Sequence, residues 1–143
     1  MFLEPKISSL RTKGSIEVIC GSMFSGKTEE LIRRLNRLKI AKKKIAAFKP
    51  VIDYRYNNKK IVSHNKNSID ATVIQKGEDI IKKITSEDVV AIDEAQFFDI
   101  SLIATCTKLA NSGKRVIVCG LDMDFLGNPF GIMPSILAIA EHV

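Results

Sequence analysis

Residues 15–28 read SIEVICGSMFSGKT, an apolar run of β-prone residues followed directly by a glycine-rich loop that ends in Lys-Thr. The loop, residues 21–28, matches the pattern G-x-x-x-x-G-K-[ST]. Helical periodicity comes next, because Leu31, Leu35 and Leu38 recur at i, i+4 and i+7. Strand, loop and helix in this order are typical of a phosphate-binding loop, in which backbone N–H groups and the helix N-terminus hold the anion. A glycine-rich turn capped by Thr28 is the plainer alternative.

Short apolar runs alternate with helical patterns along the rest of the chain. We expect a loop over residues 50–67, which are polar, basic and rich in asparagine. The predicted strands are residues 15–20, 44–49, 69–74, 88–93 and 114–120; the predicted helices are residues 28–43, 77–84, 100–113 and 134–143. Such alternation predicts an α/β fold of the P-loop class, with a mainly parallel sheet and helices on both faces.

The composition fits one soluble domain. The 143 residues are enough for a single core, and 45% hydrophobic with 27% charged residues is ordinary for a globular protein. We expect an N-terminal extension, residues 1–14, and one nucleotide-binding domain, residues 15–143. Residues 1–14 lack the apolar stretch of a secretory signal, and no apolar run is long enough to cross a bilayer. We therefore expect a cytoplasmic protein that does not contact a membrane.

The cysteines and the basic residues indicate no further function. The three cysteines are scattered and form no CxxC pair, so we expect buried thiols rather than disulfides or a zinc site. The net charge of +6 is concentrated in residues 27–60, which hold 12 basic and three acidic side chains. A solvated helix face explains this zone better than nucleic-acid binding, because no RNA- or DNA-binding motif accompanies it.

An acidic pair ends the predicted strand at residues 88–93, in the stretch VVAIDEAQFF (residues 89–98). Carboxyl ends of parallel strands meet at one edge of a sheet, so Asp93 should lie near the phosphate loop. There Asp93 and the Thr28 hydroxyl would bind Mg²⁺, and Lys27 would contact the β- and γ-phosphates of ATP. Glu94 could accept a proton from the group that attacks the γ-phosphate. On its own, an Asp-Glu pair at a helix N-terminus would be the simpler explanation.

Three features favour a small uncharged acceptor over water. Aromatic residues that could form an apolar slot for a flat base lie near the acidic pair and in the stretch LDMDFLGNPFG (residues 121–131): Phe97, Phe98, Phe125 and Phe130, with Met23 in the loop. For Phe98, core packing is the preferred interpretation. After Lys60 the only arginine is Arg115, whereas kinases of phosphorylated acceptors need several. Arg55 could neutralise charge during transfer, or could be an ordinary surface residue.

The stretches GSMFSGKTEELIRR, FKPVIDYRY, DEAQFF and LDMDFLGNPFG, in this order, resemble the cytosolic-type (type II) thymidine kinases over residues 16–143. The resemblance implies a RecA-like core that transfers the γ-phosphate of ATP to the 5′-hydroxyl of thymidine or a deoxyuridine-type nucleoside, with Mg²⁺. Glu94 is then the general base. The implied ATP-binding residues are Gly21, Ser22, Met23, Phe24, Ser25, Gly26, Lys27, Thr28, Asp53, Arg55, Asp93 and Gln96. The implied nucleoside-binding residues are Phe97, which stacks on thymine, with Met23, Leu121, Phe125 and Phe130. Magnesium is assigned to Thr28 and Asp93, with Asp53 as an additional candidate.

The resemblance also implies a homotetramer and a role in nucleotide salvage for DNA synthesis. The printed chain ends where family members continue into a zinc-bearing segment whose lasso covers thymidine, and His142 alone is no zinc site. Because the last predicted helix runs uncapped to Val143, we expect ATP binding by these residues but weak or absent thymidine phosphorylation. A P-loop ATPase module and a catalytically weak nucleotide-binding fragment are the alternatives.

Overall fold

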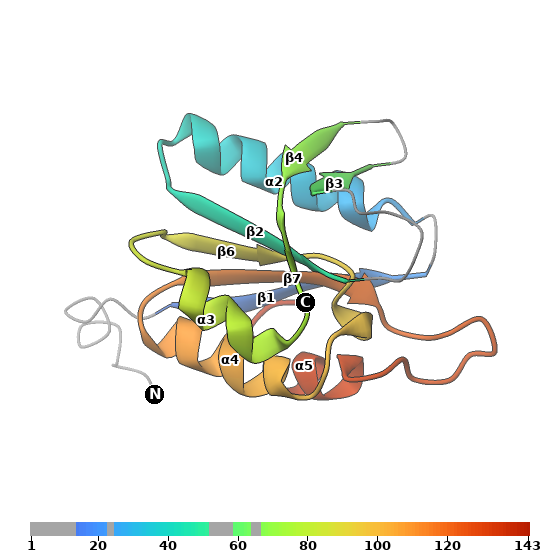
Figure 1. Cartoon of the computed structure of the whole chain (residues 1–143). Coiled ribbons are helices and arrows are strands. Elements are labelled where there is room, and N and C mark those ends of the chain that lie inside the picture. The colour runs from blue at the N-terminus through green and yellow to red at the C-terminus, as the bar shows by residue number, and fades with distance from the viewer. Residues whose placement is uncertain (1–13, 23–24, 52–58, 64–66) are drawn as a thin grey trace, which may run out of the picture.

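Five parallel strands form the main sheet of the computed structural model, which describes residues 14–22, 25–51, 59–63 and 67–143. The strand order is β1-β7-β6-β2-β5, and every neighbouring pair is parallel. The strands are β1 (Ser15–Gly21), β2 (Ile45–Pro50), β5 (Thr72–Ile74), β6 (Val89–Ile92) and β7 (Arg115–Leu121). The predicted mainly parallel α/β sheet is confirmed. Its strands end together, at the edge that the phosphate loop occupies (Figure 1).

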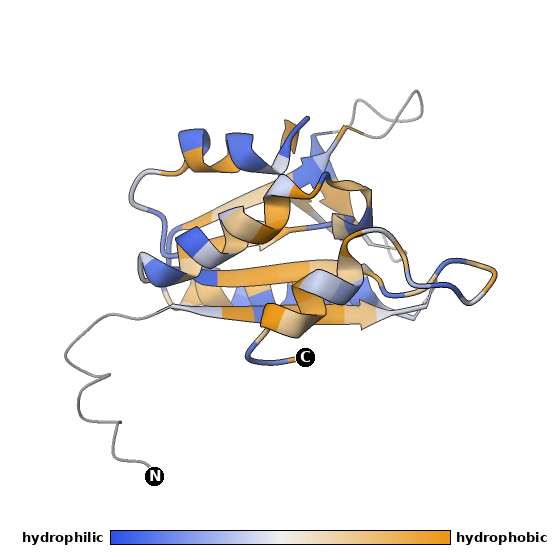
Figure 2. Ribbon diagram, turned by 90° about the horizontal axis from the view of Figure 1, so that it is seen from below, coloured by the Kyte–Doolittle hydropathy of each residue, from blue (hydrophilic) through white to orange (hydrophobic). Residues whose placement is uncertain are grey.

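Helices cover both faces of this sheet, as predicted (Figure 1). Helix α2 (Lys27–Ile40) packs on one face, and α3 (Ile80–Lys83), α4 (Ser101–Asn111) and α5 (Met133–Ile139) pack on the other. Residues of β6 alternate between the two cores: Val89 and Ala91 join the α2 side, whereas Val90 and Ile92 join the α4 side. Because both faces are buried, β6 is apolar throughout and β7 is apolar after Arg115, and Figure 2 shows this hydrophobic centre of the sheet.

In the described part of the chain two short 3₁₀ turns lie between these elements: η2 (Gly77–Asp79), which leads into α3, and η3 (Ala95–Phe97), which follows β6. The expected helix over residues 77–84 is thus one turn of 3₁₀ helix and one of α-helix. No helix in the described ranges combines the length and apolar character needed to cross a membrane.

The segment over residues 50–74 differs from the prediction. Strand β3 (Lys60–Val62) lies inside the span expected to be a loop, and it pairs antiparallel with β4 (Ser68–Asp70). The single strand expected over 69–74 is therefore two strands in different sheets, β4 in the hairpin and β5 in the main sheet. Each hairpin strand buries one residue, Ile61 or Ile69, against the α2 side of the core. One buried position in three residues gives no periodicity, so the sequence pattern could not indicate the hairpin.

The C-terminal segment also corrects the prediction. Helix α5 ends at Ile139, not at Val143, and Ala140 has an extended conformation. The segment then runs beside β1, where Glu141 N–H and His142 N–H donate to Ile16 O, and Val18 N–H donates to His142 O at 2.9 Å. The outer edge of β1 carries backbone groups that β7 cannot reach, and pairing with residues 141–142 satisfies part of them. The helix does not run uncapped to the last residue.

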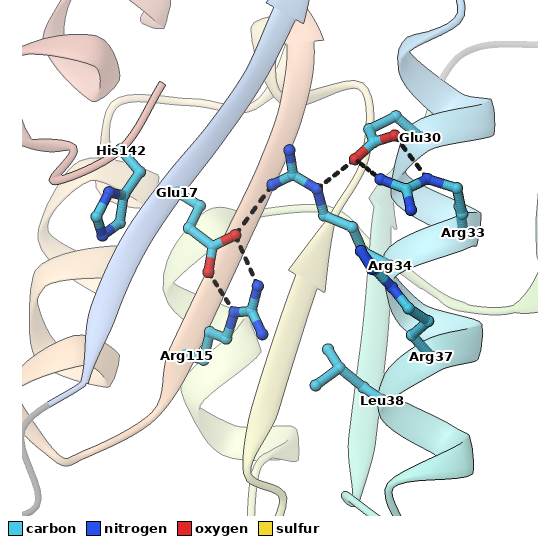
Figure 3. Close-up of a pocket in the computed structure, with 8 residues that line it drawn as sticks. All are labelled: Glu17, Glu30, Arg33, Arg34, Arg37, Leu38, Arg115 and His142. Carbon is cyan, nitrogen blue, oxygen red and sulfur yellow. Dashed lines mark hydrogen bonds and ion pairs between the residues drawn. The ribbon is translucent and has the colours of Figure 1, made fainter.

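A chain of ion pairs fastens α2 to the edge of the sheet. Glu17 on β1 is 7% exposed and lies between Arg34 of α2 and Arg115 of β7, with both of which it forms ion pairs (Figure 3). Arg34 also binds Glu30 at 2.6 Å, and Glu30 binds Arg33. These residues, with Arg37, Leu38 and His142, line a cavity of about 500 Å³. Because Glu30 lies in the first turn of α2, the network holds the helix that begins at the phosphate loop.

Replacing the buried carboxylate tests this network. Glu17→Gln should lower the free energy of unfolding by about 1–3 kcal/mol, because Arg34 and Arg115 lose charge-assisted hydrogen bonds. Partial solvent exposure of both arginines keeps the loss below that of a fully buried pair. Urea unfolding measures the difference. Glu78→Gln, the same change at an exposed position, is the control, and equal stability of the two variants would contradict the expectation.

Candidate active site

The phosphate loop joins β1 to α2 through Gly26, which occupies the N-cap position of the helix with φ 87°. This left-handed conformation suits glycine, and nothing lies within 4 Å of the place where a side-chain carbon would stand. Space is therefore open above the backbone at the start of the helix, as the approach of a phosphate requires. Within the loop, Ser25 N–H donates to Ser22 O at 3.2 Å, and Lys27 Nζ donates to Ser22 O at 3.4 Å. The lysine thus reaches back across the loop that it follows.

Asp93 follows β6 and is buried, with 7% of its surface exposed. Burial, and secondarily the charge of Glu94, raises the pKa of Asp93 to about 6. The Glu94 backbone N–H, the Cys119 thiol and the positive charge of Lys27 act in the opposite direction. The effect of Lys27 places the phosphate loop and the end of β6 in one electrostatic environment, although β7 lies between β1 and β6.

This donor set fits Mg²⁺. A buried carboxylate with incomplete charge compensation gains from a nearby cation, and Thr28 supplies a hydroxyl in the first turn of α2. Among the described residues, no group of three or more His, Cys, Asp or Glu side chains could hold a metal ion unaided. Mg²⁺ commonly uses one or two protein ligands together with substrate phosphates and water, so the small donor set is sufficient.

Glu94 has a left-handed backbone conformation, with φ 52° and ψ 43°. Outside glycine this conformation is uncommon and costs about 1 kcal/mol or more. It turns the chain sharply from β6 into η3, and the side chain of Glu94 remains partly exposed. Its Oε1 accepts a hydrogen bond from Gln96 Nε2 at 2.9 Å. Gln96 therefore holds one oxygen of the Glu94 carboxylate.

An apolar cavity of about 560 Å³ opens beside the loop. Its lining consists of one phosphate-loop residue and the segment after β7: Ser22, Leu121, Asp122, Met123, Asp124, Phe125, Gly127 and Phe130. The segment folds back on itself, because Asp124 Oδ1 accepts the N–H groups of Leu126 and Asn128, both at 2.9 Å. A cavity with an apolar wall that adjoins the phosphate loop can hold a flat base while its attached group faces the phosphates.

The structure brings most of the predicted nucleoside-binding residues to this cavity. Leu121, Phe125 and Phe130 line it, and Phe97 meets Phe130 edge to face, with ring centroids 5.4 Å apart. Phe125 is 95% exposed, so its ring is available to a ligand. Phe98 is buried in the core of the α4 side, which confirms the preferred interpretation.

The remaining predicted residues fall into three groups. Gly21 ends β1, Lys27 and Thr28 begin α2, and Ser22, Ser25 and Gly26 lie between the two elements. Gln96, predicted to bind ATP, is buried beneath Glu94. Met23, Phe24, Asp53 and Arg55 lie outside the described residues.

Sequence reasoning missed several residues of the site. Asp122, Met123 and Asp124 line the cavity, and their position directly after a predicted strand was the available signal. Lys49, at the end of β2, was missed as well. Burial lowers the pKa of Lys49, and the charges of Asp93 and Glu94 act against that shift. Lys49 Nζ also donates to Lys60 O at 2.8 Å, which connects the hairpin to this edge of the sheet.

Fold and site together define a P-loop protein of the α/β class. The solved structure of the ATPase DotB of Legionella pneumophila shares this fold, with a TM-score of 0.52. The likeness covers 96% of this chain and 37% of that one at 15% identity, so it concerns the fold alone.

The thymidine kinase family model matches residues 14–143. A thymidine kinase of Bacteroides thetaiotaomicron is 56% identical over 143 residues, covering 100% of this chain and 72% of that protein. A thymidine kinase of Rhodothermus is 53% identical over 146 residues, covering 100% of this chain and 68% of that protein. The chain belongs to the thymidine kinase family.

Removing the lysine of the phosphate loop tests the anion site. Lys27→Ala should weaken the binding of a non-hydrolysable ATP analogue about 10- to 100-fold, because charge-assisted hydrogen bonds to phosphate are lost. Isothermal titration calorimetry measures the affinity. Lys39→Ala removes an exposed lysine from the last turn of the same helix and should leave binding unchanged. Equal weakening by both substitutions would mean that only net charge matters.

Proposed function

We propose that the protein transfers the γ-phosphoryl group of ATP to the 5′-hydroxyl of thymidine, giving dTMP and ADP. The observation that carries this proposal is the shared boundary of two sites. Ser22 belongs to the phosphate loop and also lines the apolar cavity, so a triphosphate and a nucleoside bound at these sites would be neighbours. Membership of the thymidine kinase family supports the identity of both substrates.

Phosphoryl transfer needs alignment and charge stabilisation more than covalent chemistry, and the loop offers both. Backbone N–H groups at the start of α2 would hold the phosphates of ATP, and Lys27 would release Ser22 O to contact the β- and γ-phosphates. Thr28 and Asp93 would hold Mg²⁺, which when bound neutralises charge on the phosphates. Lys49 adds a second positive charge close enough to interact with Asp93 and Glu94.

The reaction requires a base for the hydroxyl proton. Glu94 is the residue proposed for this role, because its carboxylate is partly exposed and adjoins Asp93 at the open edge of the sheet. As the 5′-oxygen forms its bond to Pγ, the bond from Pγ to the bridging oxygen of ADP breaks. The hydroxyl proton passes to Glu94, and ADP leaves with the electron pair of the broken bond.

The nucleoside is proposed to bind in the cavity between Leu121 and Phe130, with its base against the aromatic rings. Covering these apolar side chains would also keep water away from the γ-phosphate, which favours transfer to the nucleoside over hydrolysis. On the strength of family membership we extend the proposal to a homotetramer that acts in cytoplasmic nucleotide salvage for DNA synthesis. Light scattering of the purified protein measures the oligomeric state.

Thymidine dependence tests the function. In the intact protein, thymidine should stimulate ADP release from ATP, and DNA should not, since the cavity suits one nucleoside. Stimulation by DNA without dTMP formation would instead identify an ATPase module. Release of ADP at the same rate with and without thymidine would contradict the proposal directly.

The role of the base is tested at Glu94. Glu94→Gln should lower kcat about 100-fold or more, because general-base catalysis contributes that much, and ATP affinity should stay within twofold. Single-turnover dTMP formation gives the rate, and calorimetry gives the affinity. Glu78→Gln, at an exposed position remote from the loop, should retain the wild-type rate. A Glu94→Gln variant with undiminished kcat would remove Glu94 from the mechanism.

A further inference from the structure

Gln96 lies in η3, two residues after Glu94, and only 3% of its surface is exposed. Its side-chain amide makes a hydrogen bond at each end. Nε2 donates to Glu94 Oε1 at 2.9 Å, and Oε1 accepts the backbone N–H of Leu121 at 3.0 Å. One buried side chain therefore bridges the proposed general base and Leu121, the last residue of β7.

The chemistry of the two partners fixes the orientation of this amide. A carboxylate oxygen only accepts, so it needs the NH₂ end, and a backbone N–H only donates, so it needs the carbonyl end. Turning the amide by 180° would bring oxygen against oxygen and N–H against N–H, which loses both bonds. The bridge thus has one stable arrangement.

Two glycines leave the space that Gln96 occupies. A side-chain carbon at Gly120 would stand 2.8 Å from Gln96 Oε1 and 3.0 Å from Met133 Sδ. A side-chain carbon at Gly131, where φ is 51°, would stand 2.6 Å from Gln96 O. Residues on β7 and in the loop before α5 therefore enclose Gln96 on both its side chain and its backbone, and the amide has little freedom to move.

The bridge leaves half of the Glu94 carboxylate available. Among the described residues, Oε1 receives the bond from Gln96, and no hydrogen bond reaches Oε2. A base that is held through one oxygen presents the other in a defined direction. The Leu121 end of the bridge lies at the wall of the nucleoside cavity, so the base and the cavity are joined by one side chain.

We propose that Gln96 is the positioning residue of the transfer reaction: it holds Glu94 Oε1 and fixes its place relative to Leu121 in the nucleoside cavity. Gln96 then acts through Glu94 rather than by contact with ATP, because both ends of its amide are already bonded and buried. This inference rests on the proposed function, since it assigns Glu94 the role of base. A misplacement of the base by about 1 Å is enough to cost roughly 100-fold in rate.

Two substitutions separate positioning from packing. Gln96→Glu has the same shape and keeps an acceptor for Leu121 N–H but replaces the donor to Glu94 by an oxygen. Gln96→Met is uncharged, fills similar volume and loses both bonds. Both should lower kcat about 10- to 100-fold, with the KM for ATP within twofold of wild type, because the phosphate loop is untouched. Gln75→Glu, the same change at an exposed glutamine, should match wild type in every constant.

Urea unfolding of each variant accompanies the kinetics. A lowered kcat at an unchanged KM for ATP, in variants that remain folded at the assay temperature, supports positioning. A kcat within twofold of wild type in both folded variants would overturn the inference. So would equal loss of ATP binding and rate, because that pattern marks a general structural role.

A second readout keeps this inference distinct from the proposed function. If the wild-type protein releases no ADP in response to thymidine, the proposed function is rejected. The positioning of Glu94 by Gln96 can then still be tested by crystallography. In a crystal structure of Gln96→Met, the Glu94 carboxylate should be displaced or occupy two conformers. An unmoved, single Glu94 conformer would show that Gln96 does not hold it.

Discussion

The parallel arrangement of β1, β7 and β6 is the constraint on which the site depends. Parallel strands end together, so the phosphate loop after β1, the cavity wall after β7 and the acidic pair after β6 share one edge. No single segment could supply all three. Helices on both faces are what permit this sheet, since they bury the strands on both sides.

The two adjacent carboxylates at this edge, Asp93 and Glu94, differ in burial. Asp93 is enclosed beside the Cys119 thiol, whose own pKa is raised by burial and by that carboxylate, so the thiol remains a donor to it. Glu94, one residue later, has turned outward through its left-handed backbone and meets solvent. The same two-residue stretch thus provides one carboxylate suited to a cation and one suited to a proton. The strained backbone at Glu94 is what separates them.

The parts that could be predicted from the sequence are those whose signal is local. The continuous apolar runs of β6 and β7, and the glycine-rich turn before α2, each carry their pattern within ten residues. The hairpin of β3 and β4 carries none, because Ile61 and Ile69 are single buried residues that meet only after the chain folds. The C-terminal segment was misjudged for a related reason. Its partner is the edge of β1, more than a hundred residues earlier, and helix periodicity cannot report such pairing.

Gln96 shows the same limit at the level of one side chain. Its position in the stretch DEAQFF predicted a residue near the phosphates, but one of its hydrogen bonds depends on Leu121, 25 residues away. The space for it depends on Gly120 and Gly131, which carry no recognisable motif for this purpose. In the proposed function, exposed rings such as Phe125 would contact the nucleoside directly, whereas the buried amide of Gln96 would act only through Glu94. Covering the exposed rings with a flat nucleobase would gain roughly 25 cal/mol of free energy per Å² of apolar surface removed from water. Leu121 lines this cavity and is also bonded to Gln96, so nucleoside binding and the placement of Glu94 would depend on the same residue.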